Sequence, residues 1–197
     1  MDEVKLIQKI QEGDMEKFEE LFERYKHQAI RTAYLVTGNR HTSEDIVQEA
    51  FVRCYLSIKE LRKPEQFKVW FLKMLTRIAW RAINKEKRLV PIENIFEASQ
   101  RKDSESALKD FQDEKQTQDL YDEISKLDSK HRMVLILYYY NDMSVREIAK
   151  VMNCLDGTVK SRLHTARKKL RANLGGLNTD DVYLEKGSEL CGSYKSI

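Results

Sequence analysis

The stretch that decides the fold is SVREIAKVMNCLDGTVKSRLHTARKKLR, residues 144–171, whose spacing predicts a helix-turn-helix. Ser144 is expected to cap the first helix. The apolar stripe of that helix consists of Val145, Ile148, Ala149 and Met152. Asn153 tolerates the left-handed backbone that ends a helix, and Gly157 is expected to allow a close approach at the start of the second helix. The inward residues of the second helix recur at helical spacing, at Val159, Leu163, Ala166 and Leu170.

The polar side of the second helix is basic, because no acidic residue occurs from Thr158 to Arg171. A helix of this kind fits the DNA major groove, roughly 12 Å wide, and its cations attract phosphate. Most basic helices are merely solvated faces of a bundle. A short first helix, a tight turn and an acid-free second helix together favour DNA binding.

The composition predicts an all-α protein. The chain has 197 residues, of which 41% are hydrophobic and 34% charged, with only two prolines and seven glycines and little strand-like alternation. The net charge of +3 is too small to indicate a nucleic-acid partner by itself, so the distribution of the charges along the chain matters more. Three scattered cysteines predict reduced thiols, with Cys54 buried. The sequence shows no signal peptide or long apolar run, so a cytoplasmic location is expected.

The pattern predicts two small helical domains, residues 1–88 and 118–174, joined by a flexible linker over residues 89–117 and followed by a flexible tail over residues 175–197. The linker is polar and mixed in charge, although a loosely packed helix is also consistent with its composition.

In the first block, helices are expected to be delimited by local signals. Gly13 ends the first helix, Asp14 caps the second, and Gly38-Asn39 ends it. Thr42-x-x-Asp45 is similar to a capping box for a third helix. A fourth helix is expected over residues 65–87, with Trp70 in the core.

Three motifs resemble a known family. SEDIVQEAFVRCY (residues 43–55) and FKVWFLKML (residues 67–75) resemble region 2 of bacterial sigma factors, and residues 127–174 resemble their region 4. The order of the motifs and the short chain are similar to the extracytoplasmic-function (ECF) group of the sigma-70 family. The resemblance implies a dissociable subunit that binds core RNA polymerase at the β′ clamp helices and β flap, recognises a promoter and helps to open it.

The resemblance implies that the third helix docks on the β′ clamp helices. Its inward residues are expected to be Ile46, Val47, Ala50, Phe51 and Cys54. The outward residues that would dock are Asp45, Gln48, Glu49 and Arg53. The alternative is a solvated face with a local Glu49–Arg53 pair worth only about 0.3–0.5 kcal/mol.

The resemblance implies that the fourth helix and the loop at residues 60–66 handle the −10 element, where one base is flipped out. Unstacking costs a few kcal/mol, so cations for phosphates and aromatic rings for bases are the expected tools. The residues expected to take part are Lys73, Arg77, Trp80, Arg81 and Lys85. Arg77 and Arg81 depart from the Asn and Asp that the family often has, which raises the local positive charge.

The resemblance implies that the second helix of the helix-turn-helix reads the −35 element. The residues expected to touch it are Thr158, Lys160, Ser161, Arg162, His164, Thr165, Arg167 and Lys168. Arg162, Arg167 and Lys168 are expected to contact phosphates, which position the protein without specifying sequence. Leu155 stands where the family commonly has a capping residue, so Asp156 is expected to cap this helix. Asp128 stands where the family usually has Pro, and it is expected to cap the helix that follows it.

Two other functions are possible for a chain of this composition. A stand-alone helix-turn-helix regulator would need a dimer interface or an effector pocket. An enzyme is not indicated, because the four histidines are scattered and no catalytic motif is present. The sequence therefore predicts no catalytic residue, metal, cofactor or small-molecule substrate. The family commonly uses a membrane-associated anti-sigma factor, which implies such a partner here and allows the chain to be held at the membrane.

Overall fold

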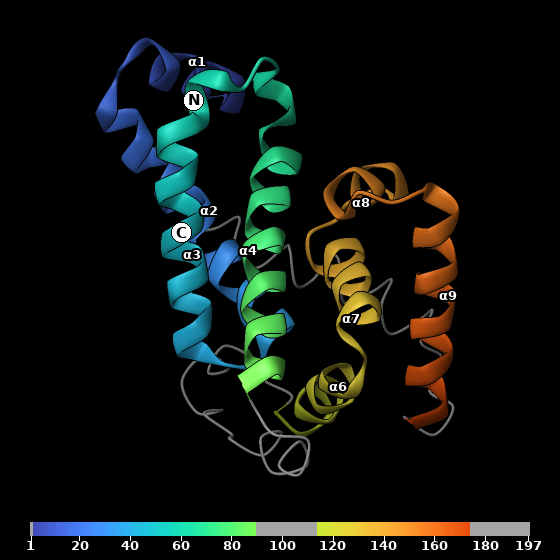
Figure 1. Cartoon of the computed structure of the whole chain (residues 1–197). Helices are drawn as coiled ribbons and strands as arrows, with labels where there is room; N and C mark the ends of the chain where they lie inside the picture. Colours follow the sequence, from blue (N-terminus) through green and yellow to red (C-terminus); the bar gives the residue numbers. More distant parts are fainter. Residues whose placement is uncertain (1, 90–113, 174–197) are drawn as a thin grey trace. The chain divides into compact units, whose positions relative to one another are not determined.

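The computed structural model describes residues 2–89 and 114–173, and these form helices and turns without a strand (Figure 1). The chain divides into two compact units whose boundary falls in the gap between the two ranges. The all-α prediction is confirmed. Most of the predicted linker and all of the predicted tail lie outside the described residues.

The first two helices begin and end as local signals predict. Helix α1 (Glu3–Glu12) ends at Gly13, which has φ +106°. Asp14 caps α2 (Met15–Thr37) by accepting from the backbone N–H of Lys17. Gly38, at φ +73°, then ends α2. A residue with a Cβ would be strained at either glycine.

Helix α3 (Arg40–Ser57) begins earlier than its predicted cap. Asn39 has an extended backbone, and its Oδ1 accepts from the N–H of Thr42 at 2.8 Å. The predicted Thr42–Asp45 capping box is therefore wrong, because Thr42 already lies inside the helix. The left-handed glycine at position 38 leaves Asn39 free to take the capping conformation.

The connection to the fourth helix consists of two 3₁₀ turns, η1 (Ile58–Glu60) and η2 (Pro64–Gln66), before α4 (Phe67–Leu89). The fourth helix therefore starts after Glu65, the residue predicted to begin it. Pro64 opens η2 because its fixed φ suits the first position of a helical turn. Gln11 ties α1 to this connection by donating to the carbonyls of Ile58 and Leu61 at 2.9 and 2.8 Å.

The core of the first unit is aromatic. Helices α2, α3 and α4 pack together (Figure 1) and bring Phe51 to 4.7 Å from Phe22, and Phe67 to 5.1 Å from Tyr25, between ring centroids. Cys54 is fully buried, as predicted, and burial raises the pKa of its thiol to about 12. Trp70 is only half-buried, so it borders this core rather than filling it.

The second unit contains the helix-turn-helix. Helix α6 (Glu114–Lys126) begins within the predicted linker, so residues 114–117 are helical. It is followed by α7 (Ser129–Leu135), a π-helical turn η4 (Ile136–Tyr140), α8 (Val145–Met152) and α9 (Asp156–Asn173). Asp128 caps α7, as predicted, by accepting from the backbone N–H groups of Lys130 and His131.

Helix α8 has a complete capping box. The Ser144 hydroxyl accepts from the N–H of Glu147 at 3.3 Å, and the Glu147 carboxylate accepts from the N–H of Ser144 at 2.8 Å. Asn153 ends α8 at φ +50°, as predicted. Helix α8 has only eight residues, and both of its ends are thus capped. Side chains or backbone groups bond to the terminal N–H and C=O groups that lack partners within the helix.

Replacing Ser144 with Ala should weaken α8, because the capping hydroxyl is lost. We expect the free energy of opening of α8, measured by amide hydrogen exchange of residues 145–152, to fall by about 1 kcal/mol. Ser161→Ala, an exposed change inside α9, is the control and should leave exchange in α8 unchanged. Equal protection of α8 in wild type and Ser144→Ala would contradict the capping role.

Candidate nucleic-acid interface

Helix α9 has one buried and one exposed face. Val159, Leu163, Ala166 and Leu170 are each at most 4% exposed. Four of the residues predicted to touch DNA are exposed, namely Lys160, Ser161, His164 and Lys168. The other four are half-buried, namely Thr158, Arg162, Thr165 and Arg167. None of the eight residues belongs to the buried stripe, and half of them are exposed.

The first turn of α9 differs from the prediction. Asp156 is already helical, so it is not the cap; the carbonyl of Leu155 accepts from the N–H groups of Thr158 and Val159 at 2.9 and 3.2 Å. The expected close approach at Gly157 is also wrong, because a Cβ there would have no heavy atom within 4 Å. Leu155 itself is 79% exposed, which leaves an apolar side chain at the entrance to the helix.

Arg167 is held by two aromatic residues that sequence reasoning missed. Its Nε donates to the hydroxyl of Tyr139 at 2.8 Å. Its guanidinium carbon lies 5.4 Å from the ring centroid of Tyr138 and 5.5 Å from that of Tyr139. The side chain of Arg167, which was predicted only to contact a phosphate, is thus held in place within the protein. The only available signal was the run of three tyrosines at residues 138–140.

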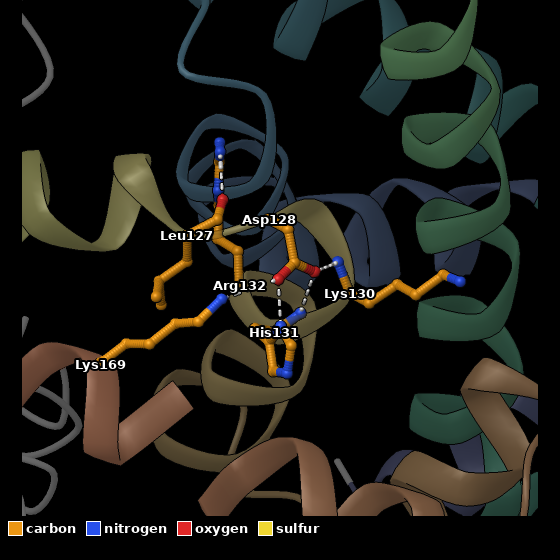
Figure 2. Close-up of polar contacts among 6 residues, drawn as sticks. All are labelled: Leu127, Asp128, Lys130, His131, Arg132 and Lys169. Carbon is orange, nitrogen blue, oxygen red and sulfur yellow. Dashed lines mark hydrogen bonds and ion pairs between the residues drawn. The ribbon is translucent and has the colours of Figure 1, made fainter. Parts of the chain in front are cut away.

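Asp128 joins the start of α7 to α9 (Figure 2). Its carboxylate pairs with the His131 imidazole and lies 3.5 Å from the Lys169 ammonium. Beside it, Arg132 donates from Nη2 to the carbonyls of Ser125 and Leu127 at 2.6 and 3.0 Å, at the end of α6. Lys169 therefore faces a carboxylate of its own domain.

The environment of Asp128 lowers the pKa of its carboxyl. Partial burial opposes this shift, but the hydrogen bonds from the side chain and backbone of His131 and from the backbone of Lys130, together with the charge of His131, outweigh it. The result is a fall from 3.8 to about 2. The ionised carboxylate is therefore the form that the folded state favours.

Helix α4 carries the residues predicted for the −10 element along one side. Arg77, Arg81 and Lys85 are exposed, whereas Lys73 and Trp80 are half-buried. On the opposite side, Phe71, Leu75 and Ile78 are at most 4% exposed. The cations are thus accessible, and the indole of Trp80 has part of its surface free for stacking.

Helix α3 presents the four residues predicted to dock on polymerase. Asp45, Gln48, Glu49 and Arg53 are all exposed, and Glu49 pairs with Arg53 at 2.5 Å. Such an exposed pair contributes well below 1 kcal/mol. The Glu49–Arg53 pair therefore adds little to the stability of the fold.

Sequence reasoning missed the apolar part of the same face. Val52 is 53% exposed and Leu56 73% exposed, and both follow Asp45 and Glu49 at helical spacing. Tyr55 is also 45% exposed. Exposed apolar side chains next to charged ones are typical of a contact surface for another macromolecule. Their signal in the sequence was hidden, because apolar residues on α3 point in several directions.

Within residues 2–89 and 114–173, no group of three or more His, Cys, Asp or Glu side chains is arranged to hold a metal ion. Among the helices of these same ranges, none has the length and apolar character needed to cross a membrane.

Comparison with known proteins identifies the family. Residues 21–89 match the family model of sigma-70 region 2, and residues 117–170 match that of sigma-70 region 4. The chain is 30% identical to the ECF RNA polymerase sigma factor SigW of Bacillus subtilis over 184 residues, covering 88% of this chain and 97% of SigW. It is 28% identical to the ECF RNA polymerase sigma-E factor of Escherichia coli (strain K12), with coverage of 84% and 90%.

Two solved structures share the fold. One is CnrH in complex with the cytosolic domain of CnrY, with a TM-score of 0.65, 20% identity and coverage of 89% of this chain and 99% of CnrH. The other is the sigma factor RpoE of Bartonella quintana with the anti-sigma factor NepR, with a TM-score of 0.63, 18% identity and coverage of 82% and 98%.

The class of protein that these features define is a DNA-binding transcription initiation factor, and neither matched family is catalytic. The chain belongs to the extracytoplasmic-function group of the sigma-70 family.

The lowered pKa of Asp128 predicts how stability depends on pH. Because the folded-state pKa is below the ordinary value, the ionised carboxylate stabilises the fold above about pH 4, and this contribution is lost as the pH falls from 3.8 toward about 2. We expect wild type to be more stable than Asp128→Asn at pH 5, and the difference to shrink toward pH 2. Hydrogen exchange of α7 at several pH values measures it. A difference that grows on acidification would contradict the role assigned to Asp128.

Proposed function

We propose that this sigma factor binds core RNA polymerase through α3, reads the −35 element with α9, and recognises and opens the −10 element with α4 and the loop at residues 60–66. The observation that carries this proposal is the separation of faces on α9. Its apolar residues are buried, and its polar face carries cations without an acid after Asp156. Residues 1–88 would form the polymerase-binding and −10 domain, and residues 118–174 the −35 domain.

The exposed face of α3 supports the docking role. Asp45, Glu49, Val52 and Leu56 lie on one stripe of the helix, flanked by Gln48 and Arg53. Apolar side chains at the centre would exclude water from the contact, and polar side chains at the rim would set its orientation. The β′ clamp helices are the partner that this segment contacts in the family, and the β flap is the partner we propose for the second domain.

The side of α4 described above supports a role in strand opening. Arg77 and Arg81 are exposed one helical turn apart, so both can follow the phosphates of a single strand. Trp80 lies between them in sequence with part of its ring accessible, which suits stacking on an unpaired base. We propose that these residues hold the non-template strand.

The exposed residues of α9 support promoter reading. Lys160 and His164 follow each other at i, i+4 near the start of the helix, the part that usually reaches base edges in a helix-turn-helix. Ser161, Thr165 and Lys168 form a neighbouring row. We propose that Lys160 contacts a base, whereas Arg162 and Lys168 contact phosphates.

We also propose that an anti-sigma factor holds this chain inactive. The two structures of the same fold support this, since one contains the anti-sigma factor NepR and the other the cytosolic domain of CnrY. Such a partner would be associated with the membrane, and the chain itself would act in the cytoplasm. The proposal includes no small-molecule substrate or cofactor.

A stand-alone helix-turn-helix regulator is the alternative. Titration of purified protein onto duplex promoter DNA, with and without core polymerase, separates the two functions. A sigma factor should bind specifically only when core polymerase is present. Tight specific binding by the chain alone, unchanged by core polymerase, would favour the alternative.

Changing both Gln48 and Glu49 to Lys should abolish binding to core polymerase, because it reverses the charge of the proposed docking face. Helicity and thermal stability should remain nearly unchanged, since both side chains are exposed. Co-elution with core polymerase measures the effect. The matched control, Glu23→Lys with His27→Lys on the exposed side of α2, makes the same change in charge and should retain binding. Normal holoenzyme formation by the α3 variant would overturn the assignment.

Changing Arg77 and Arg81 to Ala should impair opening more than initial binding, because the proposed contacts form with separated strands. Permanganate reactivity of promoter thymines should drop while closed-complex formation persists, and a pre-melted bubble template should restore activity. Lys5→Ala with Lys9→Ala on α1, also exposed and spaced i, i+4, is the control. No recovery on the bubble template would rule out a role in opening.

Lys160→Ala should change the preferred −35 sequence, because loss of a base contact costs about 1–3 kcal/mol at one position. Lys168→Ala should weaken binding to all promoters alike and make the salt dependence shallower by about one unit. Selection from a randomised −35 library with each variant holoenzyme compares them. Identical preferences for wild type and Lys160→Ala would show that Lys160 contacts the backbone instead.

A further inference from the structure

The π-helical turn brings two neighbouring tyrosines to one cation. In η4 the N–H of Asn141 reaches the carbonyl of Ile136 at 3.0 Å, and the buried Asn141 side chain donates to the same carbonyl at 3.3 Å. Successive residues of a regular helix point about 100° apart. Here the rings of Tyr138 and Tyr139 meet edge to face, with centroids 4.9 Å apart, and both contact the Arg167 guanidinium.

The contacts of Arg167 constrain its side chain without neutralising it. The hydroxyl of Tyr139 occupies Nε, and the two rings hold the guanidinium carbon. A carboxylate partner would cancel the attraction to phosphate, whereas a phenol leaves the full positive charge. The Nη groups are the part of a guanidinium that makes bidentate contacts with phosphate, and the Tyr139 bond does not use them.

Arg167 also lies in the same row of α9 as two residues proposed to read the −35 element. Lys160, His164 and Arg167 follow at i, i+4 and i+7, so they share one edge of the exposed face. An unrestrained Arg side chain loses rotamer entropy when it is fixed. A side chain that is already ordered in the free protein loses less on binding.

We propose that Tyr139 is a positioning residue that orients Arg167 toward a phosphate of the −35 duplex. The proposal rests on the proposed function of α9 and adds to it a residue outside the helix-turn-helix. Tyr139 acts through Arg167 and makes no contact with DNA of its own. The π-helical turn is what places its hydroxyl at Nε.

A double-mutant cycle tests this proposal. The holoenzymes carry Tyr139→Phe, Arg167→Ala or both, and the probe is a duplex selected by the wild-type holoenzyme from a randomised library. Arg167→Ala should weaken binding about tenfold and make the salt dependence shallower by about one unit, as expected for a lost charged contact. Tyr139→Phe should weaken it about threefold, the size expected from one hydrogen bond. In the Arg167→Ala background, Tyr139→Phe should have no effect.

Tyr138→Phe is the matched control. It removes the same atom from the neighbouring ring, whose hydroxyl makes no hydrogen bond to any residue in the described ranges. It should weaken DNA binding less than Tyr139→Phe does, because the ring that contacts Arg167 is kept. Equal binding by Tyr139→Phe and wild type would overturn the proposal. A loss on Tyr139→Phe that persists in the Arg167→Ala background would also overturn it, because Tyr139 would then act through packing.

Failure of the proposed function is distinguishable from failure of this inference. The same cycle is measured with the full chain alone on the selected duplex. If the chain alone binds as tightly as the holoenzyme, the sigma-factor role of α9 is wrong. The coupling between Tyr139 and Arg167 in that measurement still decides whether Tyr139 positions Arg167.

Discussion

Burial of the apolar stripe of α9 is the constraint on which the rest of the second unit depends. Val159, Leu163, Ala166 and Leu170 pack against α7 and α8, and each of the larger side chains contributes about 1.5–3 kcal/mol when fully buried. This packing fixes the rotation of α9 about its axis, and the cations between the apolar positions must then face outward. The exposure of the cations on α9 is thus a consequence of core packing. Burial of the apolar stripe holds these like charges together on one face although they repel one another.

In the first unit, too, core packing decides which side chains are exposed, but the exposed side chains are of other kinds. Its aromatic core orients α3 and α4, which leaves acidic, amide and apolar side chains exposed on α3 and cations exposed on α4. Val52 and Leu56 remain in water in the isolated chain, an arrangement that costs solubility and offers no gain in stability. Core polymerase, the partner proposed for this face, would cover both side chains.

Local chemistry made much of the fold predictable. Asp14, Asp128 and Ser144 cap helices as expected because each needs only a backbone N–H two or three residues away. Features that depend on distant residues were not predictable. The capping of α3 by Asn39 depends on the glycine turn before it, and the half-burial of Trp70 depends on how α4 meets the core. The π-helical turn and the link from Tyr139 to Arg167, separated by 28 residues, have no pattern in a single sequence.

The most direct test of the central claim is transcription in vitro from a randomised promoter library with purified core polymerase. A sigma factor whose two domains read DNA only within the holoenzyme should yield transcripts that begin downstream of a shared −35 and −10 sequence. These transcripts should be absent when either the chain or core polymerase is omitted. Transcripts independent of the chain, together with specific duplex binding by the chain alone, would contradict the account.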